Sequence, residues 1–318
     1  GYVFSSSNNK GKNHKIYSGN PNWLIWISAP SGRNSKFWGD TYFAQELVAE
    51  LKNSGHEAQI IFRDEDPSPF VKANTILLTL RGLLPMHTYA KCINIIWVIS
   101  HPNQISKREL KKYDQIFAAS ESWADIKSRK YGLKINPLLQ ATNPKLFNLN
   151  PALDSERSEL LFVGNTRGQY RESVRTALKS KFDLTIIGSG WDKYLPQKHV
   201  KSKFISNEEL SGVYKNSTFV LADHWNDMAK NGFISNRIFD AVASGARVIS
   251  DYVTGSKEIF GTSLVQYKDV QDLEQMLNSH SLLEKFGSDD QINQNAILIQ
   301  SKHNFQNRVS EIISLIKL

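Results

Sequence analysis

The sequence is poor in cysteine, with Cys92 as the one cysteine among 318 residues. A single thiol excludes an internal disulfide, which fits a reducing compartment. Spacings of cysteine or histidine that are typical of metal sites are also missing. Because Cys92 lies next to the apolar run over residues 93–99, we expect a packed thiol and not a nucleophile.

Long apolar runs are missing as well. No run reaches the roughly 18 residues that a membrane span needs, and residues 1–20 lack the apolar core of a signal peptide. We therefore expect a cytoplasmic protein, and peripheral association with the inner membrane face stays open. The first residue is Gly1 and not methionine, which leaves open that the chain is part of a longer multidomain protein.

Negative charge is in short supply: 31 acidic residues face 39 basic ones, a net charge of +8. A positive surface favours nucleic acid, an anionic membrane or a phosphorylated ligand. The basic residues are scattered, apart from a small cluster at Lys198, Lys201 and Lys203. Since no RNA-binding or helix-turn-helix signature accompanies the charge, we do not expect a nucleic-acid partner.

Short apolar runs alternate with segments of helical periodicity along most of the chain. This alternation predicts an α/β fold with doubly wound parallel sheets. At roughly 150 residues per domain, the length predicts two domains. The expected strands cover residues 23–30, 58–62, 75–80, 93–100, 159–164, 183–188, 217–222 and 246–251.

A stretch with two prolines and little periodicity, residues 143–158, marks the expected domain boundary. We predict a flexible tail over residues 1–21, a Rossmann-like domain over 22–150 and a second one over 151–300. The last segment, 301–318, carries an apolar stripe at helical spacing. It is expected to form a helix.

Ligands of open α/β sheets bind beyond the carboxyl ends of the strands, so the loops there are the candidate sites. In the first half, Gly32 lies in a polar turn and Asp40 at the start of the helix that follows. Asp40 can cap that helix, stabilising it by about 1 kcal/mol, and can also serve the reaction. His101 directly follows an apolar strand, which places it at the same edge.

The first loop of the second half has the sequence GNTRGQYR over residues 164–171. Its glycines allow close approach of the backbone, and Arg167 and Arg171 can pair with phosphate oxygens. The loop has neither the spacing of a dinucleotide fingerprint nor the Lys-Ser/Thr pair of a P-loop. It predicts a phosphate contact without identifying the ligand.

The strongest signal is the segment 223–246, in which polar residues lead into a helix. Ser235 is expected to cap this helix, with the amides of Ser235, Asn236 and Arg237 and the Arg237 side chain forming an anion site suited to a diphosphate. Asp240 lies one turn further. Its carboxylate can accept both hydroxyls of a ribose, or it is a surface charge near the helix N-terminus.

The segment DHWNDMAKNGFISNRIFDAVASGARVISD (223–251) resembles the donor-binding segment of bacterial GT-B glycosyltransferases, and most closely the CgeB-type group. Members of that group share an N-R-x-F-[DE]-x-x-x-x-G stretch. The segments FWGDTYFAQEL, INIIWVISHPNQIS and LLFVGNTRGQYR are similar to the same group, so the resemblance covers nearly all of residues 23–318. It implies two Rossmann-like domains facing across a cleft, with the final helix crossing back to the first domain.

The resemblance also implies roles for single residues. Gly32 would lie near the donor phosphates and the acceptor, and His101 near the transferred sugar, as in retaining members. Phe204 and Ile205 would hold the base through main-chain groups. The residues of the second half that would bind phosphate are Arg167, Arg171, Ser235, Asn236 and Arg237. Asp240 would bind the ribose.

One position departs from the pattern of retaining relatives, which carry two glutamates eight positions apart. Asp240 matches the second glutamate, but Gly232 occupies the position of the first. Asp223, Asp227 or His224 can substitute for it at the donor sugar, and His224 can also act in catalysis.

The resemblance implies a glycosyltransferase that moves a sugar from a nucleoside-diphosphate sugar, with UDP, GDP or dTDP, to a hydroxyl of a glycan, glycolipid or protein. Bacterial surface polysaccharide, glycolipid or glycoprotein synthesis is the expected setting. No D-x-D metal motif is present, so no metal and no further cofactor are expected, and arginines and helix amides would stabilise the leaving diphosphate. A sugar-nucleotide epimerase and a catalytically inert nucleotide-sugar-binding module are the alternatives.

The role of Asp40 depends on the stereochemical course of the reaction. An inverting enzyme needs a base, for which Asp40 is the candidate. In a retaining enzyme the leaving phosphate takes the proton, and Asp40 orients the acceptor. His101 favours retention.

Overall fold

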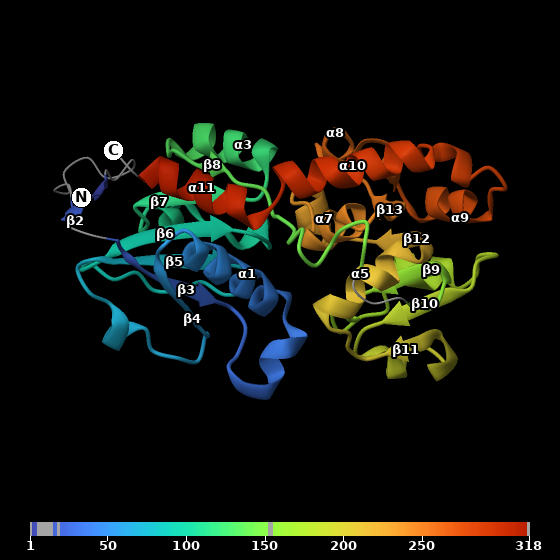
Figure 1. Ribbon diagram of the computed structural model, residues 1–318, viewed down its shortest axis with the longest axis horizontal. Coiled ribbons are helices and arrows are strands. Elements are labelled where there is room, and N and C mark those ends of the chain that lie inside the picture. Colours follow the sequence, from blue (N-terminus) through green and yellow to red (C-terminus); the bar gives the residue numbers. More distant parts are fainter. Residues whose placement is uncertain (1, 5–14, 18–19, 152–154, 317–318) are drawn as a thin grey trace. The chain divides into compact units, whose positions relative to one another are not determined.

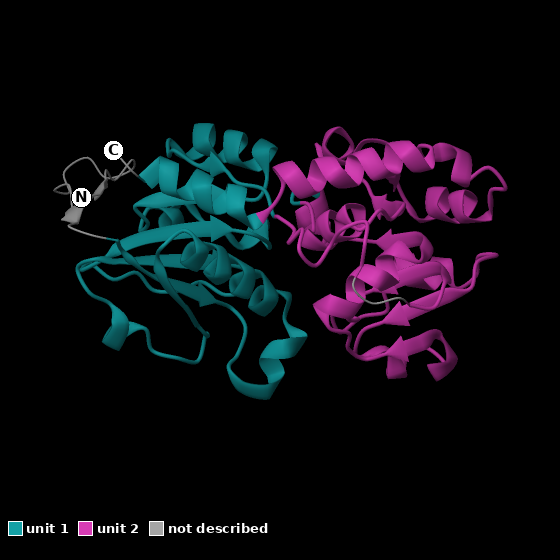
Figure 2. Cartoon of the chain, viewed as in Figure 1, with its two compact units in different colours: residues 1–140, 230–233, 305–318 teal, residues 141–229, 234–304 magenta. Residues whose placement is uncertain are grey.

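The computed structural model describes residues 2–4, 15–17, 20–151 and 155–316 (Figure 1). These residues divide into two compact units (Figure 2). Unit 1 contains residues up to Gln140 together with 230–233 and 305–318, and unit 2 contains 141–229 and 234–304. The boundary comes earlier than predicted because Thr142 belongs to unit 2, where its amide donates to His303 O at 2.9 Å.

The predicted flexible tail over residues 1–21 lies mostly outside the described residues. Within it, β1 (Tyr2–Phe4) and β2 (Lys15–Tyr17) pair as two antiparallel strands. This short pairing was not predicted, because three-residue strands leave no periodicity in the sequence.

Unit 1 contains a sheet in which every neighbouring pair of strands is parallel. Its central strands are buried on both faces and read as continuous apolar runs, as a parallel sheet requires. In spatial order the strands are β4 (Glu57–Ile61), β3 (Asn22–Ile27), β5 (Thr75–Arg81), β6 (Ile93–Val98), β7 (Gln115–Ala118) and β8 (Asn136–Pro137).

Helices cover this sheet and close unit 1. The final helix packs on the first, since the rings of Phe43 and Phe305 lie 4.9 Å apart edge to face, and Arg308 Nε donates to Leu139 O at 2.7 Å. Cys92 is fully buried and forms no disulfide, as expected. The helical segments of unit 1 are η1 (Gly32–Phe37), α1 (Gly39–Asn53), η2 (Ser68–Phe70), η3 (Pro102–Gln104), α2 (Lys107–Leu110), α3 (Glu121–Tyr131) and α11 (Phe305–Ile316).

The sheet of unit 2 repeats the parallel arrangement. Its middle strand β9 lies between β10 and β12, which places the loops after these strands side by side. In spatial order the strands are β11 (Val200–Ser202), β10 (Leu184–Ile187), β9 (Ser158–Val163), β12 (Ser217–Ala222), β13 (Val248–Asp251) and β14 (Leu264–Tyr267).

The core of unit 2 is rich in aromatic side chains, among them Phe162, Trp191 and Phe219. Buried aromatic rings supply large apolar areas, which stabilise a domain of this size. The helical segments are α4 (Glu172–Ala177), η4 (Trp191–Lys193), η5 (Gln197–His199), α5 (Asn207–Lys215), α6 (Asn226–Lys230), α7 (Asn236–Ala243), α8 (Ser256–Phe260), η6 (Gly261–Ser263), α9 (Val270–Asn278), η7 (Leu283–Lys285) and α10 (Asp289–Lys302).

The helix ends show which local signals hold. Ser206 and Glu209 form the predicted capping box of α5, and Ser120 caps α3 through the amide of Trp123. Ser235 occupies the N-cap position of α7, but its side chain makes no capping hydrogen bond. The predicted cap by the Ser235 side chain was therefore wrong.

No helix in the described part of the chain is both long enough and apolar enough to span a bilayer.

Candidate functional site

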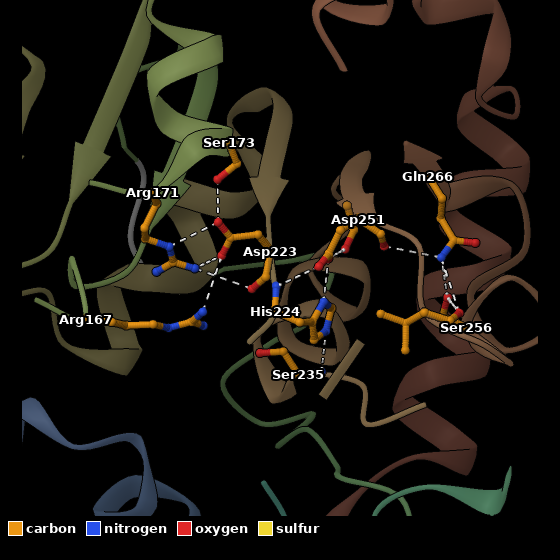
Figure 3. Close-up of polar contacts among 11 residues, drawn as sticks. Arg167, Arg171, Ser173, Asp223, His224, Ser235, Asp251, Ser256 and Gln266 are labelled. Carbon is orange, nitrogen blue, oxygen red and sulfur yellow. Dashed lines mark hydrogen bonds and ion pairs between the residues drawn. The ribbon is translucent and has the colours of Figure 1, made fainter. Parts of the chain in front are cut away.

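Polar side chains gather at the carboxyl ends of three adjacent strands of unit 2 (Figure 3). The loop with Arg167 and Arg171 follows β9, Asp223 and His224 follow β12, and Asp251 ends β13. Because these strands pair directly with one another, their ends lie close together. This is the edge at which open α/β sheets bind ligands.

Arg171 is held firmly by Asp223. Its Nη2 forms an ion pair with Asp223 Oδ1, its Nε donates to Asp223 Oδ2 at 3.1 Å, and its Nη1 donates to Asn165 O at 2.9 Å. Ser173 Oγ also donates to Asp223 Oδ2. Burial, with repulsion from Arg167 and Arg237, lowers the pKa of Arg171, and the contact with Asp223 keeps the guanidinium charged.

Arg167 points toward the same carboxylate (Figure 3), with Nη1 3.8 Å from Asp223 Oδ1. Its guanidinium stacks on the Trp225 ring at 4.6 Å from the centroid. Its backbone has a positive φ of 59°, which is rare for a side chain of this kind. Such strain persists where surrounding contacts enforce it, and it is frequent at ligand sites.

Arg237 lies near the other two arginines. A Cβ at Gly164 would stand 3.0 Å from Arg171 Nη1 and 3.3 Å from Arg237 Nη1, so the absence of a side chain there lets both groups approach. Nη1 of Arg237 is buried and has no hydrogen-bond partner among the described residues. Burial lowers the pKa of Arg237, although Tyr214 and Asp240 oppose that effect. An unpaired buried cation is costly unless a ligand completes it.

His224 uses both of its ring nitrogens within the chain. Nδ1 lies 2.6 Å from Asp251 Oδ1, and Nε2 accepts from the Ser235 amide at 2.9 Å. The contacts with His224 lower the pKa of Asp251 although burial of this carboxyl acts in the opposite direction. Neither nitrogen of His224 is left to exchange a proton with a ligand.

The N-terminus of α7 offers fewer free amides than the three that the sequence predicted. The amide of Ser235 is occupied by His224, whereas the amides of Asn236 and Arg237 are the first-turn donors for which no described residue supplies an acceptor. An anion at this end would meet these two amides together with the Arg237 side chain.

Asp240 is buried and bonded on both carboxylate oxygens. Oδ1 accepts from Thr142 Oγ1 at 2.7 Å, and Oδ2 accepts from Asn236 Nδ2 at 2.9 Å. Asp240 thus also fixes the side chain of Asn236.

A pocket of about 480 Å³ lies in the same unit and includes Phe204 and Ile205. Ile187 and Val213 supply apolar walls, and Glu209 is among the lining residues. Small-molecule sites are commonly concavities of this size with apolar walls and a few polar groups. The two residues predicted to contact a base thus share one concave surface.

In unit 1, Asp40 is the second residue of α1 and lies beside the ends of β3 and β5. The N-cap of this helix is Trp38, so the prediction that Asp40 caps it was wrong. Its Oδ2 lies 2.9 Å from where a Cβ of Gly82 would stand, and Ser28 Oγ lies 3.4 Å from the same point. Burial raises the pKa of Asp40 to about 6. A carboxyl with a pKa near the working pH can accept or orient a proton.

His101 follows β6 in unit 1 and has a positive φ of 52°. Its Nδ1 lies 2.8 Å from Ser100 Oγ. His101 and Arg167 are the residues other than glycine that have a positive φ in the described part of the chain. Gly32, the other predicted site residue of this unit, has a φ of 72° at the start of η1.

Asp227 lies in α6 and accepts from the Met228 amide at 3.0 Å. The Gly232 position has a φ of 72°, a conformation that favours glycine over glutamate. Among the described residues, no group of three or more His, Cys, Asp or Glu side chains is arranged to hold a metal ion.

Sequence reasoning missed Asp251, Ser173 and Thr142. Asp251 ends a buried strand, so the rule that selected the other loops also applied to it. Ser173 and Thr142 contribute single hydroxyls from separate segments, and no pattern in the sequence distinguishes them.

Part of the chain is similar in sequence to known proteins. Residues 167–314 match the family model of glycosyl transferase-like proteins. The spore protein CgeB of Bacillus subtilis (strain 168) is 26% identical over 149 residues, which are 42% of this chain and 46% of that protein. The match thus spans about half of the length of this curated relative.

Solved structures resemble the chain over nearly its whole length. Sucrose-phosphate synthase from Thermosynechococcus elongatus superposes with a TM-score of 0.65, at 14% identity, over 92% of this chain and 98% of that one. AviGT4, a glycosyltransferase involved in avilamycin A biosynthesis, gives a TM-score of 0.59 at 12% identity over 93% and 97%. An α-glucosyltransferase solved with UDP and a 13-mer DNA gives 0.58 at 9% identity over 94% and 100%.

At these identities the structures share the fold alone, and the range matched by the family model includes Arg167, Arg171 and Arg237. The prediction of an α/β chain with two parallel sheets is confirmed. The chain has the GT-B fold of these structures, and its residues 167–314 are similar to glycosyl transferase-like proteins.

Proposed function

We propose that this protein transfers a sugar from a nucleoside-diphosphate sugar to a hydroxyl acceptor. The observation that carries the proposal is the cluster of Arg167, Arg171 and Arg237, in which one carboxylate contacts two guanidiniums and Nη1 of the third is buried without a partner among the described residues. Such a cluster is incomplete without a multivalent anion. A diphosphate supplies the charge and the acceptor oxygens.

The remaining parts of a nucleotide have matching groups in unit 2. The amides of Asn236 and Arg237 would meet phosphate oxygens at the N-terminus of α7. Asp240 would accept from the ribose hydroxyls, and the pocket with Phe204 and Ile205 would take the base. UDP, GDP and dTDP are the candidate nucleotides.

Departure of the nucleoside diphosphate builds negative charge on its phosphates. We propose that Arg167, Arg171, Arg237 and the α7 amides stabilise this charge, so that the reaction needs no divalent metal. The acceptor would be a hydroxyl of a glycan, glycolipid or protein in bacterial surface polysaccharide, glycolipid or glycoprotein synthesis.

Asp40 is proposed to bind the acceptor hydroxyl. Under retention, which the presence of His101 favours, the leaving phosphate takes the proton, and the ionised Asp40 orients the acceptor. Under inversion, Asp40 itself takes the proton. Linkage analysis of the product distinguishes the two courses.

The first test is thermal unfolding in EDTA with UDP, GDP, dTDP, CMP and their common sugar conjugates. A ligand that binds the folded state at about 100 times its Kd stabilises the fold by about 2.7 kcal/mol. We expect a clear rise of Tm for one nucleoside diphosphate and its sugar conjugate. A Tm that is unchanged by every compound contradicts the proposed function. Conversion of the donor without any acceptor supports an epimerase instead.

Asp40→Asn is expected to lower kcat/KM for the acceptor about 10- to 100-fold while the Kd of the nucleotide stays the same. The reason is the loss of a charge-assisted hydrogen bond, worth about 1.5–3 kcal/mol. In the wild type, kcat/KM should fall below pH 6, where Asp40 becomes protonated. A loss of about 1,000-fold or more in kcat would assign Asp40 as the base, and near-normal turnover would exclude it from the reaction.

The same variant should stabilise the protein. The pKa of Asp40 is about 6 in the folded state against an ordinary value of 3.8, so the folded state binds the proton more tightly. Its contribution to the free energy of unfolding therefore falls as pH rises from about 4 to about 6. Above that range the Asp40→Asn substitution would remove a cost of up to about 3 kcal/mol, measurable as a higher Tm at about pH 8 and an unchanged Tm at about pH 3.5.

A further inference from the structure

His224 joins three elements of unit 2 (Figure 3). Its side chain is fully buried at the end of β12. It contacts Asp251, at the end of β13, twice: through its ring, at 2.6 Å, and through its backbone amide, which donates to Asp251 Oδ2 at 3.1 Å. The opposite ring nitrogen reaches Ser235, at the N-cap of α7.

These partners determine where the ring proton lies. The amide of Ser235 can only donate, so Nε2 of His224 carries a lone pair and no proton. Asp251 presents a carboxylate, so Nδ1 carries the proton and donates it. A ring in this state is a fixed bridge between a carboxylate and a backbone amide, and it does not act as an acid or a base.

The bridge holds the N-cap residue of α7 without capping the helix. Ser235 makes no side-chain capping bond, and its own amide donates to His224 Nε2. The next two residues, Asn236 and Arg237, carry the unoccupied amides and the buried Nη1. A shift of Ser235 would therefore displace the groups proposed to bind phosphate.

We propose that His224 and Asp251 are a positioning pair that sets the N-terminus of α7 for binding a nucleoside diphosphate. This inference rests on the proposed function. It assigns His224 an indirect role, through Ser235, in place of contact with the reacting atoms. Partners that fix the orientation of a functional group commonly affect affinity about 10- to 100-fold.

Asp251 is itself held in place. Ser250 Oγ donates to Asp251 Oδ1 at 3.0 Å, and Gln266 Nε2 lies 3.4 Å from Asp251 O and 2.8 Å from Ser256 Oγ. These contacts join β13 to β14 and α8, so Asp251 is held by two neighbouring elements of the unit. In Figure 3 the contacts of Asp223 with Arg167, Arg171 and Ser173 involve other residues than the contacts of Asp251.

The test uses three variants that separate the two ring contacts. In His224→Gln the side-chain oxygen can replace Nε2 and accept from Ser235. In His224→Asn the amide nitrogen can replace Nδ1 and donate to Asp251, but the Ser235 contact is lost. His224→Phe removes both contacts and keeps the ring. His280→Asn, at a position away from the site in the same unit, is the matched control.

We expect His224→Asn and His224→Phe to raise the Kd of the nucleotide about tenfold or more, with His224→Gln and the control within about threefold of the wild type. Calorimetry with UDP, GDP and dTDP measures this, and the rise should appear in the donor KM more than in kcat. In the free wild type, nitrogen NMR of the imidazole should show a protonated Nδ1, and the Ser235 amide should exchange slowly with solvent.

The outcomes separate this inference from the function on which it rests. A wild type that binds no nucleotide contradicts the proposed function. A wild type that binds, with all three variants binding equally well, contradicts the positioning pair alone. Equal weakening in His224→Gln and His224→Phe, or an imidazole protonated at Nε2, would also overturn the pair, because the Ser235 contact would then not be the effective one.

Discussion

Replacement of Arg237 by alanine is expected to weaken nucleoside-diphosphate binding by about 100-fold or more. Each charge-assisted hydrogen bond to a phosphate is worth about 1.5–3 kcal/mol, and the fork of Arg237 can make two. Arg237→Lys keeps the charge but loses the fork, so its affinity should fall between those of the wild type and the alanine variant. Calorimetric titration in EDTA measures all three.

The same change should leave the free protein more stable. Nη1 of Arg237 is buried without a partner among the described residues, and burial lowers the pKa of the guanidinium, so removal of this side chain relieves a desolvation cost. A higher Tm together with lost binding is the expected signature of a group held ready for a ligand. Arg175→Ala, an exposed arginine on α4, should change neither quantity. Undiminished affinity in Arg237→Ala would contradict the diphosphate site.

Asp223→Ala is expected to destabilise unit 2 by about 3–5 kcal/mol, because it leaves Arg171 buried without its carboxylate. Arg171 is only 4% exposed, and Arg167 loses its ion pair as well. Chemical denaturation followed by tryptophan fluorescence measures the loss. Asp192→Ala is the matched control, since its ion pair with Lys203 is exposed and such pairs contribute about 1 kcal/mol at most.

A second substitution tests the cause of that loss. Arg171→Met in the Asp223→Ala background removes the uncompensated charge, so part of the stability should return. If Asp223→Ala unfolds like the wild type, Asp223 is free to contact the donor sugar, as the family resemblance implies. A large loss that Arg171→Met does not repair would mean that Asp223 stabilises the unit through Ser173 instead.

The sequence predicted the positions of the arginines of the site better than the contacts of Ser235 and His224. The sequence predicted a cluster of Arg167, Arg171 and Arg237 because parallel strands end at one edge and because their loops are polar, and the structure brings the three side chains close together. The amide of Ser235 was assigned to the ligand, but His224 takes it. His224 itself was considered for catalysis, and in the structure its two ring nitrogens contact Asp251 and Ser235.

Elements with weak periodicity were also missed. The strands β7, β8, β11 and β14 are two to four residues long, and such short runs form strands only because a neighbouring edge supplies hydrogen-bond partners. Long elements such as α1, α11 and β5 were visible, since their apolar residues recur at the period of a helix or as a continuous run.

The sequence by itself determined the fold class, the parallel order implied by alternating strands and helices, and the loops that carry the arginines. These follow from local periodicity and from chain topology, which a single sequence contains. Only the tertiary structure decided that the Asp223 carboxylate contacts both Arg167 and Arg171, that burial raises the pKa of Asp40, and which groups His224 contacts. Each of those depends on burial and on partners distant in sequence, such as Asp251 for His224 and Gly82 for Asp40.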